Sequence, residues 1–428
     1  LIIFIMLSIK YIRENESFVR QSLRNKNAID IDVDNLLSID KDRRTTIVEV
    51  ENLKSKRNSV SKEIAKLKSS GDNADKMIIE MKRVSSSIKS LDDHLNLLND
   101  QIKEILYSIP NIISPTTPIG KSDDENKIIR EWGEKPSFDF ELKSHLDLID
   151  ELEMVDFSKG SLLSGSGFPF YIGKGARLER SLINYMIDYQ TNNNGYTEAF
   201  PPFLVNRASM VTTGQLPKFA DDMYTLEKDG LFCIPTAEVP ITNIYRNKVL
   251  SEEELPIKIA GYSACFRREA GSYGKETRGL LRVHQFNKVE LVQFSKPENS
   301  YYQLEEILNN AEEILQNLGL HYRVVELCSG DLSFSAAKCY DIEVWSPFEK
   351  KYLEVSSCSN FLDFQSHRGN IRYKCKETGK HKFIHTLNGS GLATPRLFVA
   401  IIETYQTKSG KINIPNPLVS YMGTKEIT

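Results

Sequence analysis

The sequence of 428 residues contains 55 Lys and Arg against 58 Asp and Glu, which gives a formal net charge of −3 at pH 7. Apolar residues make up 40% and charged residues 26%, values that exclude collagen-like, mucin-like and wholly disordered chains. At roughly 100–200 residues per domain, we expect two or three domains. The near-neutral charge excludes a uniformly basic nucleic-acid coat, although it leaves room for a local basic patch.

The first residues show neither a membrane span nor a secretory signal. The longest uncharged apolar run, residues 1–7, is much shorter than the roughly 20 residues that a spanning helix needs. A secretory signal places its positive charges before the apolar stretch, whereas Lys10 and Arg13 come after it here. We therefore expect residues 1–5 to be an extension before a start at Met6, and the protein to be cytoplasmic.

Six cysteines are scattered along the second half of the chain. None forms a C-x-x-C pair, and their spacing fits neither a zinc site nor a compact disulfide framework. We expect reduced thiols that pack as small apolar side chains, and no structural zinc. The cysteines are Cys233, Cys265, Cys328, Cys339, Cys358 and Cys375.

Residues 40–107 contain no proline and carry a heptad repeat, which is typical of a coiled coil. Gly71–Asp75 interrupts the repeat with a turn and a helix-capping signal. The pattern predicts an antiparallel hairpin of two helices that projects roughly 45–50 Å. In the second helix the apolar positions, spaced alternately by four and three residues, are Val84, Ile88, Leu91, Leu95, Leu98, Ile102 and Ile105. In the first helix they are Val50, Leu53, Val60, Ile64 and Leu67, with Arg57 as a polar interruption.

The two helices of this predicted hairpin differ in charge. Between Lys41 and Lys68 there are nine basic and four acidic residues, a net charge of +5, whereas residues 76–107 carry five of each sign. One interpretation is the solvated outer face of a coiled coil. The other is a basic side suited to the phosphate backbone of a nucleic acid.

A proline-containing linker with Pro110, Pro115 and Pro118 follows, and the pattern then becomes mixed. Amphipathic helices are predicted over residues 175–193 and 301–318, and strands over 322–328, 340–345 and 352–356. No G-x-G-x-x-G or P-loop follows a strand, which disfavours the common nucleotide-binding folds. The fold class predicted is α+β, with a mostly antiparallel sheet flanked by helices.

Three segments carry residues suited to nucleotide chemistry. Cys265–Gly271 and Arg278–Glu290 place arginines, a glutamate and an aromatic ring on two neighbouring arms. Arginine recognises phosphate and carboxylate groups, and the ring can stack on a base. In Glu354-Val-Ser-Ser357, a carboxylate and a hydroxyl could share a magnesium ion, although a polar edge strand would look the same. Asn388–Arg396 is glycine-rich and brings an arginine to the start of an apolar helix.

These segments resemble motifs 2 and 3 of the class II aminoacyl-tRNA synthetases. Thr236-Ala-Glu238, Gly214–Phe219, His284-Gln-Phe286 and the predicted hairpin narrow the resemblance to the seryl-tRNA synthetase family, over about Met6 to Gly423. The resemblance implies a tRNA-binding domain over residues 1–109 and a class II catalytic domain over 110–428. It also implies a homodimer, with Pro202 at the interface.

The site residues implied by the resemblance fall into overlapping sets. The serine site consists of Thr236, Ala237, Glu238, Arg267, Glu290 and Ser390. The ATP site consists of Arg267, Arg268, Glu269, Val283, Phe286, Glu354, Val355, Ser356, Ser357 and Arg396. Within these sets, Arg267 and Arg396 are the catalytic arginines, and Glu354 and Ser357 are the magnesium ligands.

The activity implied is the ATP-dependent attachment of L-serine to tRNA(Ser), with the selenocysteine tRNA, tRNA(Sec), as a further candidate, and with Mg²⁺ as cofactor. Thr394-Pro395, before Arg396, departs from the valine and glycine of many members, and Val419-Ser420 and Phe168–Phe170 also vary. Two alternatives remain: an amino acid ligase acting on a carrier protein, and an inactive RNA-binding homologue. The predicted hairpin disfavours the first. The second is disfavoured because the four side chains whose loss would indicate an inactive homologue are all present: Arg267, Glu269, Glu354 and Arg396.

Overall fold

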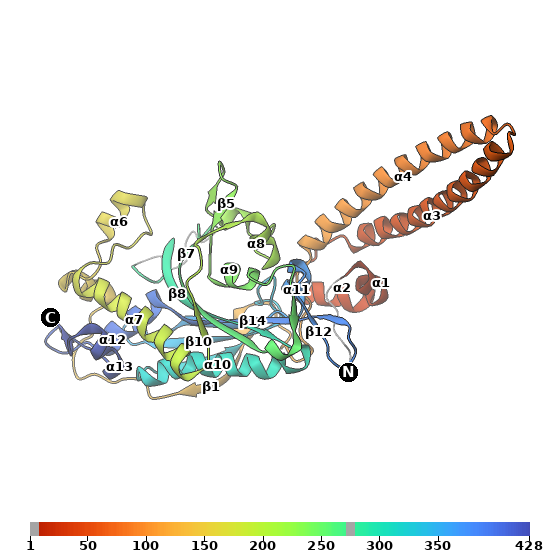
Figure 1. The fold of residues 1–428 in the computed structure, drawn as a ribbon. Coiled ribbons are helices and arrows are strands. Elements are labelled where there is room, and N and C mark those ends of the chain that lie inside the picture. Colours follow the sequence, from red (N-terminus) through yellow and green to blue (C-terminus); the bar gives the residue numbers. More distant parts are fainter. Residues whose placement is uncertain (1–7, 271–278) are drawn as a thin grey trace. The chain divides into compact units, whose positions relative to one another are not determined.

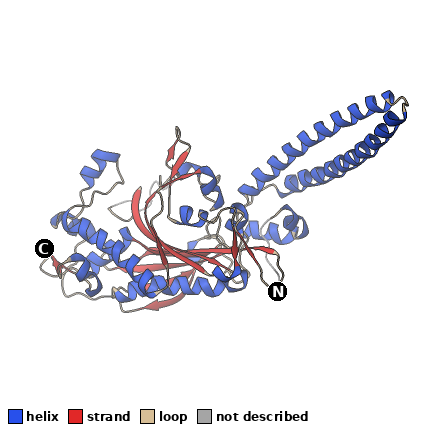
Figure 2. Cartoon of the chain, in the orientation of Figure 1, coloured by secondary structure: helices blue, strands red, loops and turns tan. Residues whose placement is uncertain are grey.

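The structure, a computed structural model, describes residues 8–270 and 279–428. The chain divides into two compact units, and each is described by itself. The first contains residues 8–24 and Ala28–Pro110, and the second contains Asn25–Asn27 and Asn111–Thr428. Figure 2 shows that the first unit is built of helices, whereas the second combines a sheet with helices.

The predicted hairpin is present as the two longest helices of the described residues, α3 (Val33–Ser70) and α4 (Asp75–Ser108) (Figure 1). Gly71 ends α3 in the left-handed region, at φ +84°, where a residue without a Cβ atom is favoured. An apolar seam lies between the helices, and it joins Val84 and Ile88 of α4 to Leu53, Val60 and Ile64 of α3, all of them predicted heptad positions. Met81 extends the seam three residues before the first position predicted in α4.

The hairpin begins earlier than the sequence pattern predicts, because α3 starts at Val33. Asp32 caps this start and accepts a hydrogen bond from the Asn35 N–H at 2.9 Å. Asp40, fully buried, forms ion pairs with Arg13 at 2.6 Å, Arg43 at 2.9 Å and Arg44 at 3.1 Å. Although burial raises the pKa of this carboxyl group, hydrogen bonds from Arg43 and Arg13 bring it below its usual value. Asp40 therefore joins the base of α3 to the first short helix as a charged group.

That first unit also contains two short helices before the hairpin, α1 (Ile9–Glu14) and α2 (Glu16–Asn25). Two lysine–carboxylate ion pairs cross between the arms of the hairpin, Lys54 to Asp92 at 3.0 Å and Lys56 to Glu80 at 2.6 Å. All four of these side chains are about half exposed. They add little stability, so the apolar seam is what holds the arms together.

The second unit is organised around an eight-stranded sheet in which every pair of neighbours is antiparallel except β2 and β7. This confirms the predicted fold class. In spatial order the strands are β1 (Lys127–Trp132), β9 (Tyr322–Glu326), β10 (Lys338–Ser346), β11 (Lys351–Asn360), β14 (His385–Ala393), β8 (Gln285–Ser295), β7 (Ile257–Phe266) and β2 (Thr197–Ala199).

Three long helices share one apolar core with this sheet: α7 (Gly173–Asn193), α10 (Ser300–Asn317) and α12 (Thr394–Thr404) (Figure 1). The first two match the helices predicted at 175–193 and 301–318. Gly175 allows α7 to pack closely, because a Cβ atom there would lie 2.0 Å from the carbonyl oxygen of Met154. The resulting rigid layer supports the strands that carry several of the candidate site residues.

Smaller elements complete this unit. The helices are α5 (His145–Glu151), α6 (Phe157–Ser164), α8 (Arg207–Thr212), α9 (Glu238–Asn243), α11 (Phe364–Gly369) and α13 (Asn416–Met422). The strands are β3 (Leu204–Asn206), β4 (Thr225–Leu226), β5 (Leu231–Cys233), β6 (Val249–Ser251), β12 (Arg372–Lys374), β13 (His381–Phe383), β15 (Ile412–Asn413) and β16 (Glu426–Ile427). No helix in residues 8–270 or 279–428 combines the length and the apolar character needed to cross a membrane.

Candidate active site

A cavity of about 600 Å³ opens on the second unit, where the sheet, the start of α12 and residues 215–223 meet. Most of the predicted site residues line it, although they come from segments far apart in the sequence. Those residues are Thr236, Glu238, Arg267, Glu269, Val283, Phe286, Glu354, Val355, Ser357, Ser390 and Arg396. The sequence motifs therefore converge on one site.

Four predicted site residues do not line the cavity. Ala237 and Glu290 are fully buried behind it. Ser356, also buried, donates a hydrogen bond to the carbonyl oxygen of Ser390 at 2.6 Å. Arg268 lies over the ring of Tyr224, 5.1 Å from its centroid. Gly271 and Arg278, at the tip of the second motif, lie outside the described residues.

One end of the cavity combines a guanidinium group with an aromatic ring. Cys265 of β7 pairs with Phe286 of β8, and the Arg267 guanidinium lies 5.2 Å from the centroid of the Phe286 ring. Glu269 adopts a φ of +53°, which is uncommon for a residue with a side chain, and its carboxylate accepts from Arg282 Nε at 2.6 Å. A flat ring, a carboxylate and a guanidinium can together recognise a purine base and an adjacent phosphate.

A β-bulge explains how Glu354 and Ser357 face the same cavity. Residues three apart in a regular strand point to opposite faces. Here Ile342 of β10 pairs with Ser356, but Glu343 pairs with Glu354, so that Val355 is the extra residue of the bulge. Since the bulge shifts the alternation by one residue, both side chains reach the cavity.

The same edge holds an acidic residue that the sequence reasoning missed. Asp341 is the cross-strand partner of Ser357. Burial, followed by the charge of Glu354, raises the pKa of the Asp341 carboxyl well above its usual value. Two neighbouring carboxyl groups and a hydroxyl are oxygen ligands of the kind that Mg²⁺ prefers, and a divalent cation would relieve their repulsion. The residues present therefore fit the magnesium ion that the resemblance implies.

The second arginine is held beside this acidic edge. Arg396, in the first turn of α12, donates from Nη1 to the carbonyl oxygen of Glu354 at 2.9 Å and from Nε to that of Leu281 at 3.2 Å. Its Nη1 atom is also 3.5 Å from Glu354 Oε2. Pro395 fits in the first turn of α12 because backbone N–H groups there have no acceptor within the helix, so the N–H that proline lacks is not needed. The sequence departure at Thr394-Pro395 thus leaves the arginine inside the cavity.

The opposite end of the cavity has a buried polar floor. Glu290 accepts hydrogen bonds from Thr236 Oγ1 at 2.7 Å and from Asn388 Nδ2 at 3.0 Å, and it forms an ion pair with Lys288. Asn388 Nδ2 also donates to Glu238 Oε2 at 3.0 Å, so one amide group bridges two carboxylates. Ser390 is the cross-strand partner of Glu290. A floor of this kind suits a small ligand that carries both an ammonium group and a hydroxyl.

Glu238, also part of this floor, has a perturbed acidity. Burial, followed by the charge of Glu290, raises the pKa of Glu238 to about 7, and the amide of Gln365 donates to its Oε1 atom at 2.6 Å. Asn388 belongs to a motif already singled out, although no role had been assigned to it. Lys288 likewise lies in a segment already singled out, Arg278–Glu290, without an assigned role. Gln365 lies in no such segment, and only the fold shows its contact with Glu238.

Comparisons with known proteins identify the family. The family model described as the seryl-tRNA synthetase N-terminal domain matches residues 6–113, and that of the class II core domain for G, H, P, S and T matches residues 224–405. Serine–tRNA ligase from Chlorobium luteolum is 54% identical over 427 residues, which cover 99% of both chains. The chain belongs to the seryl-tRNA synthetase family. The ligase from Carboxydothermus hydrogenoformans is 52% identical, again over 99% of both chains.

Solved structures agree with the family assignment. The structure resembles seryl-tRNA synthetase from Pyrococcus horikoshii complexed with ATP, at 36% identity, a TM-score of 0.93 and 99% coverage of both chains. It also resembles the cytoplasmic serine–tRNA ligase of Naegleria fowleri in complex with AMP, at 30% identity, a TM-score of 0.88 and 99% coverage of both. The family, the fold class and the enzyme class predicted from the sequence are thereby confirmed.

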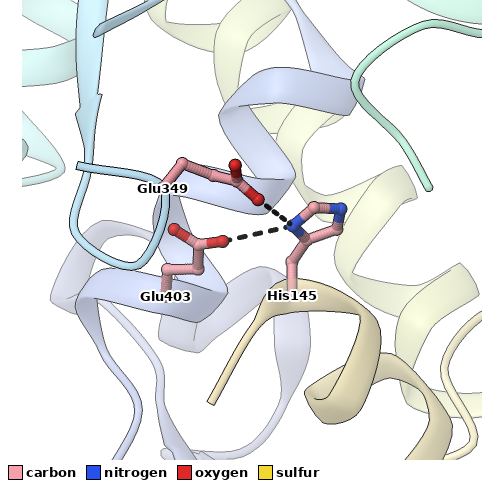
Figure 3. A group of neighbouring side chains, drawn as sticks. All are labelled: His145, Glu349 and Glu403. Carbon is pink, nitrogen blue, oxygen red and sulfur yellow. Dashed lines mark hydrogen bonds and ion pairs between the residues drawn. The ribbon is translucent and has the colours of Figure 1, made fainter. Parts of the chain in front are cut away.

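A separate cluster joins Glu403 of α12 to His145 and Glu349 (Figure 3). His145 Nδ1 is 3.2 Å from Glu403 Oε1 and 3.9 Å from Glu349 Oε1. These carboxylates already have other partners: Glu403 accepts from Ser346 Oγ at 2.5 Å, and Lys351 Nζ is 3.5 Å from Glu349. The nearby donors and the ammonium group disfavour a cation there, so we interpret the cluster as a network that fixes α12.

Proposed function

We propose that this member of the seryl-tRNA synthetase family activates L-serine with ATP to seryl-adenylate and then transfers serine to tRNA(Ser). The observation that supports this most strongly is the single cavity lined by the predicted site residues. The Arg267–Phe286 pair, the Arg396–Glu354 edge and Thr236, which donates to the buried Glu290, lie around this one space.

In the first step, the serine carboxylate attacks the α-phosphorus of ATP and pyrophosphate leaves. The carboxylate is already ionised at neutral pH, so no general base is needed, and catalysis consists of positioning and charge stabilisation. We assign Arg267 to the α-phosphate and the serine carboxylate. Phe286 stacks on adenine beside Val283, and Glu269 accepts from the adenine amino group. Arg396 binds the γ-phosphate end.

Glu354 and Ser357 are the proposed magnesium ligands, and Asp341, the cross-strand partner of Ser357, adds a further carboxyl group on the neighbouring strand. When bound, Mg²⁺ supplies positive charge to the phosphate oxygens. Residues of the chain position the other positive charge at this edge. Arg396 is held by the backbone carbonyl groups of Glu354 and Leu281, so its guanidinium is in place before the nucleotide arrives.

Serine selection is proposed for the polar floor formed by Thr236, Glu238, Glu290 and Ser390, with Asn388 as the bridge. A site built to hydrogen-bond a hydroxyl group rejects an analogue without it by roughly 10⁴–10⁵, since its buried polar groups are then left unpaired. Alanine should therefore be rejected. Ala237, between Thr236 and Glu238 in the chain, is fully buried.

The partners follow from both units. The hairpin of α3 and α4 is proposed to bind tRNA(Ser), with tRNA(Sec) as a further candidate, through the basic side of α3. A homodimer is proposed around α7 and the segment that ends at Pro202, where Phe200 is 75% exposed. All six cysteines are free, which supports a cytoplasmic location because reducing compartments keep thiols in this state.

Amino-acid-dependent ATP–pyrophosphate exchange across the twenty amino acids tests the proposal. We expect exchange with serine, and exchange with alanine lower by at least about a thousandfold in kcat/KM. Charging of tRNA(Ser) with serine by the same preparation separates this function from a ligase acting on a carrier protein, which would exchange without charging tRNA. Exchange with another amino acid in preference to serine, or none at all, would refute the assignment.

A further inference from the structure

Glu179 of α7 is a buried carboxyl group that has no part in the chemistry described above. It does not line the cavity, and it is 5% exposed. Its Oε1 atom accepts a hydrogen bond from Asn287 Nδ2 at 2.8 Å and a second, short one from the hydroxyl of Thr394. The Thr394 hydroxyl also lies 3.1 Å from the carbonyl oxygen of Asn287. One carboxyl oxygen therefore joins three elements, α7, β8 and α12.

The two partners of Glu179 are neighbours of the proposed ATP-binding residues. Asn287 directly follows Phe286 in β8, and Thr394, the first residue of α12, stands two positions before Arg396. Thr394 is also one of the residues at which this chain departs from many members of the family. We propose that Glu179 is a positioning residue for ATP binding, which sets the distance between the Phe286 strand and the Arg396 helix turn. This inference rests on the proposed function.

The surroundings of Glu179 disfavour its charged form. Neither its Oε2 atom nor the buried hydroxyl of Tyr171 has a hydrogen-bond partner within the described part of the chain. Burial raises the pKa of Glu179 to about 7, although Thr394 and Asn287 lower it. Glutamine keeps the Oε1 acceptor and carries no charge, so it is the conservative replacement, whereas leucine removes the acceptor.

The alternative is that Glu179 only stabilises the packing of α7. A purely structural group would lower the melting temperature without a specific effect on the nucleotide. A matched control is Glu312 of α10, a buried carboxyl group that also joins separate elements, through Arg130 Nε at 2.9 Å and the Tyr322 hydroxyl at 2.9 Å. It does not line the cavity.

The experiment is a double-mutant cycle on E179L, T394V and the combined variant, with E179Q and E312Q alongside. We expect E179L and T394V each to raise KM for ATP about fivefold to tenfold in serine-dependent exchange, with KM for serine within about twofold of wild type. The combined variant should raise KM for ATP by less than the product of the two single effects, because both changes break the shared contact between Glu179 and Thr394. E179Q should stay within about threefold of wild type, and E312Q should lower the melting temperature without changing KM for ATP.

Several results would overturn the proposal: an unchanged KM for ATP in T394V, changes that multiply in the combined variant, equal shifts in both KM values, or an E179Q variant as impaired as E179L. If E179L does not fold, the KM values for ATP of T394V and E179Q still test the proposal. Calorimetric titration with ATP alone repeats the cycle without serine. A wild-type protein that binds ATP but shows no serine exchange would therefore contradict the proposed function while still testing Glu179.

Discussion

Replacing Arg267 with alanine should lower serine-dependent ATP–pyrophosphate exchange by at least about a hundredfold while the fold stays intact. The Arg267 guanidinium lines the cavity, 5.2 Å from the Phe286 ring centroid. It is the group that we expect to meet the charge developing on the α-phosphate, where a preorganised donor contributes a few kcal/mol. Because the residue is exposed to the cavity, its removal leaves no hole in the core. Exchange rates and circular dichroism of the same preparation check both parts.

Arg268 provides a matched control for this substitution. It is the next residue in the chain, but it lies over Tyr224 and does not line the cavity. R268A should therefore retain exchange within about fivefold of wild type, whereas a surface-charge effect would act on both variants alike. Near-normal exchange in R267A, or an equal loss in both variants, would remove the catalytic role from Arg267.

Deleting Lys41–Ile105 should abolish tRNA charging and spare seryl-adenylate formation. The second unit has its own apolar core around the sheet, so the cavity does not depend on the hairpin for its shape. The deletion leaves Asp40 with Arg13, its shortest ion pair, and so retains a partner for this buried carboxylate. Serine-dependent exchange should stay within about threefold of wild type, while charging of tRNA(Ser) should fall below detection because phosphate contacts supply much of RNA affinity.

A charge-reversal variant of α3 separates the effect of its basic charge from the effect of deleting the whole hairpin. Lys62, Lys66 and Lys68 are exposed on α3, and their triple replacement by glutamate keeps the apolar seam at Val60 and Ile64. We expect weaker tRNA binding, a smaller dependence of that binding on salt, and unchanged exchange. Full tRNA charging by the deletion variant would contradict the proposed role of the hairpin.

Local patterns in the sequence were sufficient for the hairpin and for the general position of the site. Heptad spacing alone locates the seam of α3 and α4, because a coiled coil depends on residues three and four apart. It misses the first turns of α3, where the capping by Asp32 and the ion pairs of Asp40 set the start. The motif residues were recognised as a group because each motif is contiguous in the chain.

Long-range register explains what the sequence could not show. Glu354 and Ser357 share a face only because β11 forms a bulge against β10. The sequence Glu354-Val-Ser-Ser357 does not by itself predict that bulge. Asp341 reaches them from the neighbouring strand, and Asn388 joins Glu238 to Glu290 across the sheet. No local pattern distinguishes Glu179 from other residues of a helix, because its partners, Asn287 and Thr394, are 108 and 215 positions away.

A crystal structure of the protein with L-serine and a non-hydrolysable ATP analogue is the most direct measurement of the central claim. The account predicts adenine on the Phe286 ring, the triphosphate between Arg267 and Arg396, and the serine ammonium group and hydroxyl on the floor formed by Glu290 and its neighbours. A structure in which the nucleotide lies elsewhere, or in which the two arginines turn away from an empty cavity, would contradict it.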